Sequence, residues 1–180
     1  MPLCLHTAQV VPEHDCIARV GSRSLRLLQW HFHSPSEHTL SGQHAAMELH
    51  LVHRDEATGA PVVLAVLVQP GGAANSTLDA ILKAAPADPA APPSPLQLPF
   101  SLLSLLPRPA DGQRHYATYR GSLTTPPCSE GVEWFVFLDP LHVSADQILA
   151  FQFYVGGGTT LGLNTRPVQP LGERMIQYFV

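Results

Sequence analysis

Histidine is concentrated in one short part of this sequence. Six of the ten histidines lie close together: His31, His33, His38, His44, His50 and His53. An imidazole can bind a metal ion through a ring nitrogen or exchange a proton near neutral pH. The cluster is therefore the first candidate for a metal-binding or proton-transfer site.

The spacing of these histidines fits two β-strands, in which side chains point alternately to opposite faces. In the run LRLLQWHFH, His31 and His33 share one face, and His50 lies in the run 45–52 (AAMELHLV), whose length between turn signals suits a strand. If the two strands are neighbours, the three imidazoles converge. The opposite faces are mostly apolar and carry Leu28, Trp30, Phe32, Met47, Leu49, Leu51 and His53.

Three imidazoles on adjacent strands match the catalytic type of zinc site, because three protein nitrogens leave a fourth tetrahedral position open for water. Each ligand ring also needs an acceptor for its second N–H, which fixes its tautomer and orientation. Gln29 precedes His31 by two positions and Glu48 precedes His50 by two, so each acceptor shares a face with its histidine. We therefore predict a Zn²⁺ site formed by His31, His33 and His50.

A second metal motif competes for some of these residues. His31-x-His33-x-x-x-Glu37 also fits the first metal motif of cupins, β-barrels in which the glutamate is a ligand and the metal is often iron or manganese. The second cupin motif does not follow Glu37, which makes the cupin hypothesis the weaker one. The other histidines of the cluster lack matched acceptors, and we expect them at the surface or outside the ligand set: His38, His44 and His53.

The elements that must position these residues are mostly short extended runs. Predicted strands are residues 1–11, two runs within 16–33 around the Gly21-Ser22 turn, 45–52, 62–68 and 132–138. Predicted short helices are residues 75–82, capped by Asn75 or Ser76, and 144–151, and the Ala/Pro-rich residues 84–99 are expected to form a loop. We predict a mainly β fold with a central twisted, mostly antiparallel sheet and small peripheral helices.

Composition excludes several classes of protein. The chain has 180 residues, 45% of them hydrophobic, which indicates one folded domain with a sizeable core. Its 14 acidic and 10 basic residues give a net charge of −4 and do not supply the basic stripe of a nucleic-acid-binding protein. No apolar run approaches the roughly 20 residues of a membrane helix. We therefore predict no nucleic-acid partner and no membrane segment.

The three cysteines are Cys4, Cys16 and Cys128, and no CxxC pair is present. A thiolate zinc cluster or a thioredoxin-type motif is therefore excluded. The first twenty residues show no basic stretch followed by an apolar one, so no secretion signal is visible in them.

Four segments, in this order, resemble the α-class carbonic anhydrases: QWHFHSPSEH (29–38), MELHLVH (47–53), YRGSLTTPPCSEGVEWFV (119–136) and NTRPVQPL (164–171). The resemblance runs from about His6 to Pro170, and the PSEHTL run is most similar to bacterial or algal members. It implies a zinc hydro-lyase that reversibly hydrates carbon dioxide to bicarbonate and a proton, and that binds sulfonamide-type inhibitors.

The resemblance also implies roles for individual residues. The zinc ligands would be His31, His33 and His50, and their orienting acceptors would be Gln29, the backbone carbonyl of Asn164 and Glu48. Thr124 would orient the attacking nucleophile and donate a hydrogen bond to Glu37, and His6 would shuttle the proton released by the reaction. The residues around the substrate would be Val52, Val66, Leu123, Thr125, Val132 and Trp134.

The sequence also departs from the family pattern. Family members carry a further N-terminal segment, so we expect the single domain of residues 1–180 to be N-terminally incomplete. In secreted members the cysteine of TTPPC pairs with one in that segment, which would leave Cys128 without its partner. The alternative function is a catalytically weak or silent zinc-binding or interaction module. The resemblance implies a secreted, periplasmic or organellar location.

Overall fold

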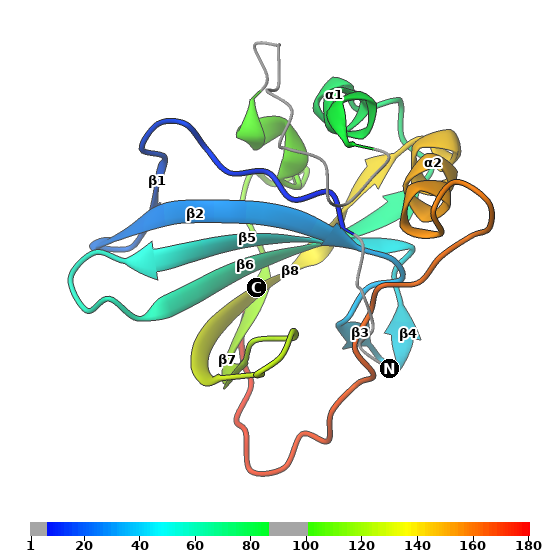
Figure 1. The fold of residues 1–180 in the computed structure, drawn as a ribbon. Coiled ribbons are helices and arrows are strands. Elements are labelled where there is room, and N and C mark those ends of the chain that lie inside the picture. Colours follow the sequence, from blue (N-terminus) through cyan, green and yellow to red (C-terminus); the bar gives the residue numbers. More distant parts are fainter. Residues whose placement is uncertain (1–6, 87–100) are drawn as a thin grey trace.

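A computed structural model gives the fold and describes residues 7–86 and 101–180 (Figure 1). A seven-stranded sheet runs in the order β1-β2-β5-β6-β8-β7-β9. Its strands are β1 (Ile17–Val20), β2 (Arg23–His33), β5 (Met47–Asp55), β6 (Pro61–Pro70), β7 (Tyr116–Ser122), β8 (Glu130–Val143) and β9 (Gln177–Phe179). The remaining elements are the hairpin β3 (Thr39–Leu40) and β4 (Gln43–His44), the helices α1 (Ser76–Ala84) and α2 (Ala145–Val155), and the 3-10 helix η1 (Leu102–Leu105).

The pairing of the strands confirms the predicted fold class. β6 and β8 run parallel, and the other neighbouring pairs of this sheet are antiparallel. The sheet is open, with β1 and β9 at its edges. The histidines lie on a single open sheet and not on the two-sheet jelly-roll barrel of a cupin, so the cupin hypothesis is wrong.

The two helices cover one face of the sheet (Figure 1). Trp30 and Phe32 of β2 and Leu49 of β5 join Ile81 of α1 and Phe151 of α2 in one buried apolar cluster. A sheet covered in this way needs apolar residues on its inner strands, and β6 is buried from Val62 to Val68. The predicted buried strand at 62–68 is therefore confirmed, and the opposite face of the sheet is left for the histidines.

Both predicted helices are present, and the first begins at the expected cap. The Asn75 side chain accepts hydrogen bonds from the backbone N–H groups of Thr77 and Leu78, and that of Ser144 accepts one from Gln147. These bonds satisfy backbone donors that the first helical turn leaves without partners.

Some sequence-based expectations need correction, and others fall outside the described residues. Within residues 7–11 the predicted N-terminal strand is reduced to one bridge between Val10 and Trp30. The predicted loop 84–99 lies largely outside the described residues, as does Cys4. Leu28 does not share a face with Trp30, because the register of β2 against β5 shifts by one residue between Leu27 and Gln29, and Leu28 is 38% exposed. β7 and β9 were not predicted at all.

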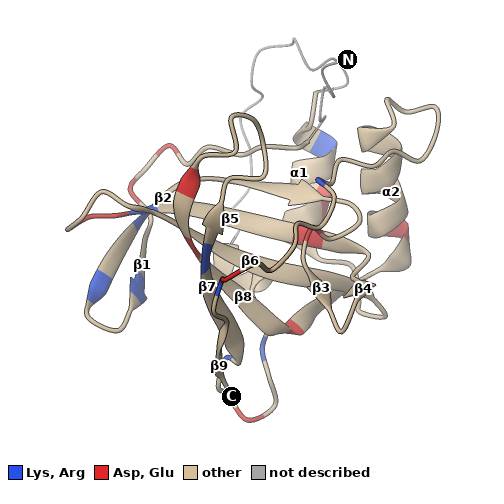
Figure 2. Cartoon of the chain, turned by 90° about the horizontal axis from the view of Figure 1, so that it is seen from below, with Lys and Arg blue, Asp and Glu red and all other residues tan. Residues whose placement is uncertain are grey.

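Charged residues are sparse in the described part of the chain (Figure 2), and several of their side chains form ion pairs. Arg23 at the start of β2 donates to Asp55 and forms a two-pronged contact with Glu133 of β8. Arg26 pairs with Glu56. These ion pairs join β2, β5 and β8 at the end of the sheet that lies away from the histidines. Among the described residues, none of the helices has the length and apolar character that crossing a membrane requires.

Candidate metal centre

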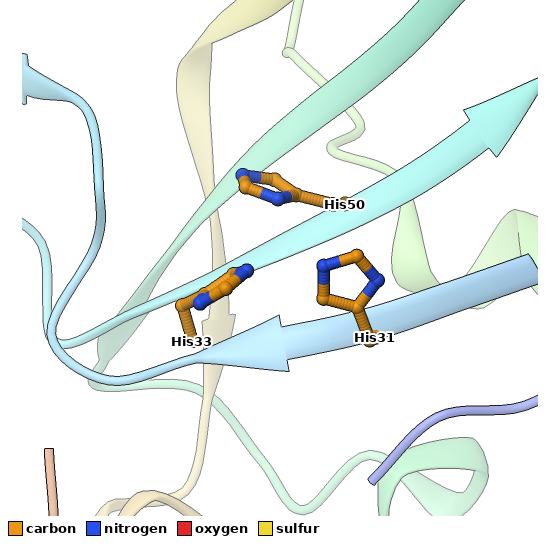
Figure 3. A group of neighbouring side chains, drawn as sticks. All are labelled: His31, His33 and His50. Carbon is orange, nitrogen blue, oxygen red and sulfur yellow. The ribbon is translucent and has the colours of Figure 1, made fainter. Parts of the chain in front are cut away.

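The imidazoles of His31, His33 and His50 face one another from two adjacent strands (Figure 3). His31 and His50 are direct cross-strand partners in the β2–β5 pairing, and His33 follows two positions along the same face of β2. The ring centroids lie 4.6 to 5.3 Å apart, and each ring offers one nitrogen within 4.8 Å of the other two. The predicted convergence of the three histidines is confirmed as a geometric fact.

Each imidazole is oriented by a hydrogen bond from its second ring nitrogen. His31 Nδ1 donates to Gln29 Oε1, His33 Nδ1 donates to the backbone carbonyl of Asn164, and His50 Nε2 donates to Glu48 Oε1, each at 2.8 Å. Strand alternation predicts the contacts of Gln29 and Glu48, and the family resemblance implies the contact of Asn164. The other ring nitrogens, His31 Nε2, His33 Nε2 and His50 Nδ1, take no part in these bonds and are available to a metal ion.

The surroundings favour neutral imidazoles, the form that binds a metal. Burial, with the neighbouring His50 and His33, lowers the pKa of His31 to about 2. Burial is also the main cause that lowers the pKa of His33. His33 Nε2 is buried and has no hydrogen-bond partner. Because a buried polar atom is costly without a partner, this nitrogen fits a metal ion as its missing partner.

Glu37 lies beside the same nitrogens. Its Oε2 is 3.6 Å from His33 Nε2 and 3.9 Å from His50 Nδ1, and it has no hydrogen-bond partner. Its Oε1 accepts a hydrogen bond from the backbone N–H of Arg166 at 2.8 Å. The expected bond from Thr124 to Glu37 is not among the hydrogen bonds of the described residues, and Oε2 is the oxygen available for it.

The C-terminal segment that contains Asn164 and Arg166 contacts two residues of the site, His33 and Glu37. Besides holding His33, Asn164 accepts a hydrogen bond from the Ser34 N–H through its side-chain oxygen at 2.7 Å and donates to the Phe32 carbonyl at 3.0 Å. This side chain is 1% exposed. The sequence carries no local signal for Arg166, because its contact with Glu37 is made by the backbone.

An apolar cluster lies on the same face of the sheet as the histidines. Its buried members are Val63, Ala65, Val132, Trp134 and Val136, and Val52, Tyr119 and Leu123 pack against them. The expected positions of Val52, Leu123, Val132 and Trp134 on this face are therefore consistent with the structure.

Val66 was predicted in this apolar cluster, and that prediction is wrong. Val66 belongs to the cluster on the opposite, helix-covered face, where it pairs with Leu49. Val63 is the cross-strand partner of Val52 and takes the place expected of Val66. The error has a physical cause, because β6 is apolar on both faces and its sequence therefore does not indicate which residues face the site.

The two threonines before the prolines differ in exposure. Thr124 is half-buried, and Thr125 is exposed and accepts a hydrogen bond from the Cys128 N–H through its carbonyl at 2.9 Å. Cys128 and Cys16 carry free thiols. His6, the expected proton shuttle, lies outside the described residues.

The other three histidines of the cluster lie outside the set His31, His33 and His50, as expected, but only one of them is at the surface. His44 is exposed, as expected, but His53 is 3% exposed and donates to the Leu51 carbonyl on the opposite face of β5. His38 contacts Glu48 through both its ring and its backbone N–H. Sequence spacing could not reveal this contact, because a loop and a hairpin separate the two residues.

The comparisons with known proteins agree with this geometry. A family model for eukaryotic-type carbonic anhydrases matches residues 6–180. The carbonic anhydrase of Neisseria gonorrhoeae is 40% identical over 172 residues, which cover 95% of this chain and 63% of the relative. The chain thus spans less than two thirds of that relative.

Two solved structures share the fold. Carbonic anhydrase Cah3 from Chlamydomonas reinhardtii, in complex with acetazolamide, is 44% identical, with a TM-score of 0.89 over 97% of this chain and 74% of that one. The α-carbonic anhydrase of Thermovibrio ammonificans, in complex with the inhibitor sulfanilamide, is 38% identical, with a TM-score of 0.81 over 93% of this chain and 69% of that one. The resemblance found in the histidine, TTPPC and NTRP segments is therefore one of descent, and the chain belongs to the eukaryotic-type, or α-class, carbonic anhydrase family.

Proposed function

We propose that this chain binds Zn²⁺ through His31, His33 and His50 and catalyses the reversible hydration of carbon dioxide to bicarbonate and a proton. The observation that carries the proposal is the convergence of three imidazoles whose other ring nitrogens are all bonded to acceptors. Three neutral nitrogen ligands are the donor set of a catalytic zinc site. Zinc in such a site lowers the pKa of a bound water from 15.7 to about 7, for which carbonic anhydrases are the standard example.

The residues around the imidazoles have complementary tasks in this proposal. Gln29, Glu48 and the Asn164 carbonyl hold the ligand rings in place. Thr124 orients the attacking nucleophile and passes a hydrogen bond to Glu37, whose Oε2 has no other partner. Because a carboxylate oxygen can only accept a hydrogen bond, Glu37 Oε2 would select the threonine orientation in which the hydroxyl hydrogen points to Glu37 and the hydroxyl lone pairs face the nucleophile.

The apolar cluster beside the histidines suits carbon dioxide, which has no dipole and no hydrogen-bond donor. Val52, Val63, Val132, Trp134 and Leu123 would hold it against the site, with Thr125 at the solvent side. A small apolar pocket with a few placed polar groups is the usual form of a small-molecule site. Val63 takes part in this proposal in place of Val66.

The test combines metal analysis with kinetics on the same sample. We expect one zinc per chain by elemental analysis, hydration of carbon dioxide in a stopped-flow assay, and inhibition of that hydration by sulfanilamide. Zinc at full occupancy without hydration would instead establish the silent zinc-binding module. Absence of stoichiometric zinc from a folded sample supplied with Zn²⁺ would overturn the ligand assignment itself.

A further inference from the structure

Glu48 is anchored by more than the histidine ligand that it orients. Its side chain is fully buried on β5, and Oε1 accepts a hydrogen bond from His50 Nε2 at 2.8 Å. His38 supplies the other anchors, since its Nδ1 donates to Oε1 at 2.5 Å and its backbone N–H donates to Oε2 at 2.8 Å. A buried carboxylate is costly unless its oxygens are satisfied. Both oxygens of Glu48 therefore take their positions from His38.

His38 is held in turn by Tyr119, which lies on β7. His38 Nε2 is 2.7 Å from the Tyr119 hydroxyl. Burial raises the pKa of Tyr119 above its ordinary value, so the hydroxyl stays protonated and keeps both donor and acceptor capacity. The tyrosine hydroxyl can thus donate to an unprotonated Nε2 or accept from a protonated one. This bond fixes the plane of the His38 ring.

The Tyr119 ring is positioned by three features of its surroundings. The Arg174 guanidinium lies 5.5 Å from the ring centroid, within the range of a cation–π contact. Gly121 leaves the space that the ring needs, because a Cβ at this position would lie 2.8 Å from Tyr119 Cε2. The ring also lies parallel to its cross-strand partner Trp134, at an interplanar angle of 8°.

Arg174 is itself tied to the segment that precedes it. Its side-chain N–H groups donate to three backbone carbonyls, those of Gln169, Pro170 and Leu171. The edges of the guanidinium are thus used within residues 169–174, and its face is left for Tyr119. The position of residues 169–174 therefore determines where the guanidinium contacts the Tyr119 ring.

We propose that Arg174 is a positioning residue for the metal centre. It acts on the ligand His50 through Tyr119, His38 and Glu48. The inference rests on the proposed zinc site. Among the described residues, no hydrogen bond, ion pair or ring contact joins Arg174 to the three ligands, so the route runs through the contacts Arg174–Tyr119, Tyr119–His38, His38–Glu48 and Glu48–His50. A change in the position of residues 169–174 would then change the position of the His50 ring.

The test is a double-mutant cycle read out by metal binding. Zn²⁺ affinity is measured by competition with a chelator, and the visible spectrum of the Co²⁺-substituted protein reports ligand geometry. We expect Arg174→Met to weaken Zn²⁺ binding about threefold and to shift the Co²⁺ spectrum, in line with the modest strength of a cation–π contact. Arg174→Lys keeps the charge and restores part of the affinity. Arg120→Met is the matched control, because Arg120 is an exposed arginine of the same strand as Tyr119.

The cycle separates positioning from general stability. In a Tyr119→Phe background the ring remains under Arg174 but no longer bonds His38, so Arg174→Met should still lower the melting temperature of the metal-free protein while leaving Zn²⁺ affinity unchanged. Equal losses of affinity in both backgrounds would overturn the proposed route. An unchanged affinity and Co²⁺ spectrum in Arg174→Met alone would overturn the inference while leaving the zinc site intact. Failure of the parent protein to bind Zn²⁺ would instead overturn the proposed function.

Discussion

The backbone N–H of Arg166 donates to Glu37 Oε1 at 2.8 Å, although 129 positions separate the two residues in sequence. This bond turns the second oxygen of Glu37 toward the ligand nitrogens of His33 and His50. Because the donor is a backbone group, the contact depends on the path of the C-terminal segment and not on the arginine side chain.

His50→Ala should abolish stoichiometric zinc binding, because two imidazoles seldom retain Zn²⁺ against water in a site of this type. The measurement is elemental analysis after dialysis against a weak chelator. His53→Ala is the control, since His53 is equally buried on β5 but faces the opposite side of the sheet. One zinc per chain at unchanged affinity in His50→Ala would contradict the ligand assignment.

Glu48→Ala should weaken zinc binding by about 10–100-fold, the usual effect of removing a group that orients a ligand. The loss is smaller than that of a ligand because His50 itself remains. Chelator competition measures the affinity of the mutant and the parent under the same conditions. An affinity equal to that of the parent would show that Glu48 does not orient His50 for the metal.

Thr124→Ala should keep zinc and lose hydration activity by about 10–100-fold, because the change removes the orientation of the nucleophile but no ligand. Stopped-flow hydration at verified full zinc occupancy is the measurement. Thr118→Ala provides a control for removing a threonine hydroxyl, because Thr118 lies on β7, the strand that precedes Thr124. Normal hydration in Thr124→Ala would reject the assigned role.

Asp55→Asn should remove an acid-sensitive contribution to stability. The hydrogen bond from Arg23, followed by the backbone N–H groups of Thr58 and Ala57, lowers the pKa of Asp55 from 3.8 to about 2 in the folded protein. Because the folded-state pKa is depressed, this contribution is complete above about pH 4 and is lost as the pH falls toward 2.

The measurement for Asp55→Asn is thermal unfolding of the metal-free parent and mutant between pH 2 and 6, since zinc loss in acid would mask the effect. The parent should exceed the mutant in melting temperature above pH 4, and the difference should shrink as the pH approaches 2. A difference that stays constant over this range would rule out Asp55 as its source.

Asn164→Ala should lower the free energy of unfolding by about 1–3 kcal/mol, because the buried Ser34 N–H loses its acceptor. The backbone carbonyl that holds His33 is retained, so folded protein should still bind zinc. Denaturant unfolding measures the first effect and chelator competition the second. Gln169→Ala, an exposed change in the same segment, serves as the control. Unchanged stability would mean that the Ser34 bond contributes nothing.

The sequence predicts the part of the site that depends on strand alternation, and it misses the part that depends on distant contacts. His31, His33 and His50 lie at strand positions whose side chains must share a face, and Gln29 and Glu48 follow from the same rule. The contact of Arg174 with Tyr119 joins segments whose relative position only the fold determines. Val66 was misplaced because an apolar strand buried on both faces shows no alternation from which to choose Val63.

The extra residue in β2 has a consequence for how this sheet can vary. Between Leu27 and Gln29 the pairing with β5 skips Leu28, so Leu25 and Leu27 reach the same apolar face as Trp30 and Phe32 although the two pairs differ in parity. The ion-paired end of β2 and its histidine end therefore pair with β5 in registers that differ by one residue. The exposed Leu28 lies between them. Deleting Leu28 would merge them into a single unbroken alternation and leave the histidines on the face that they already occupy.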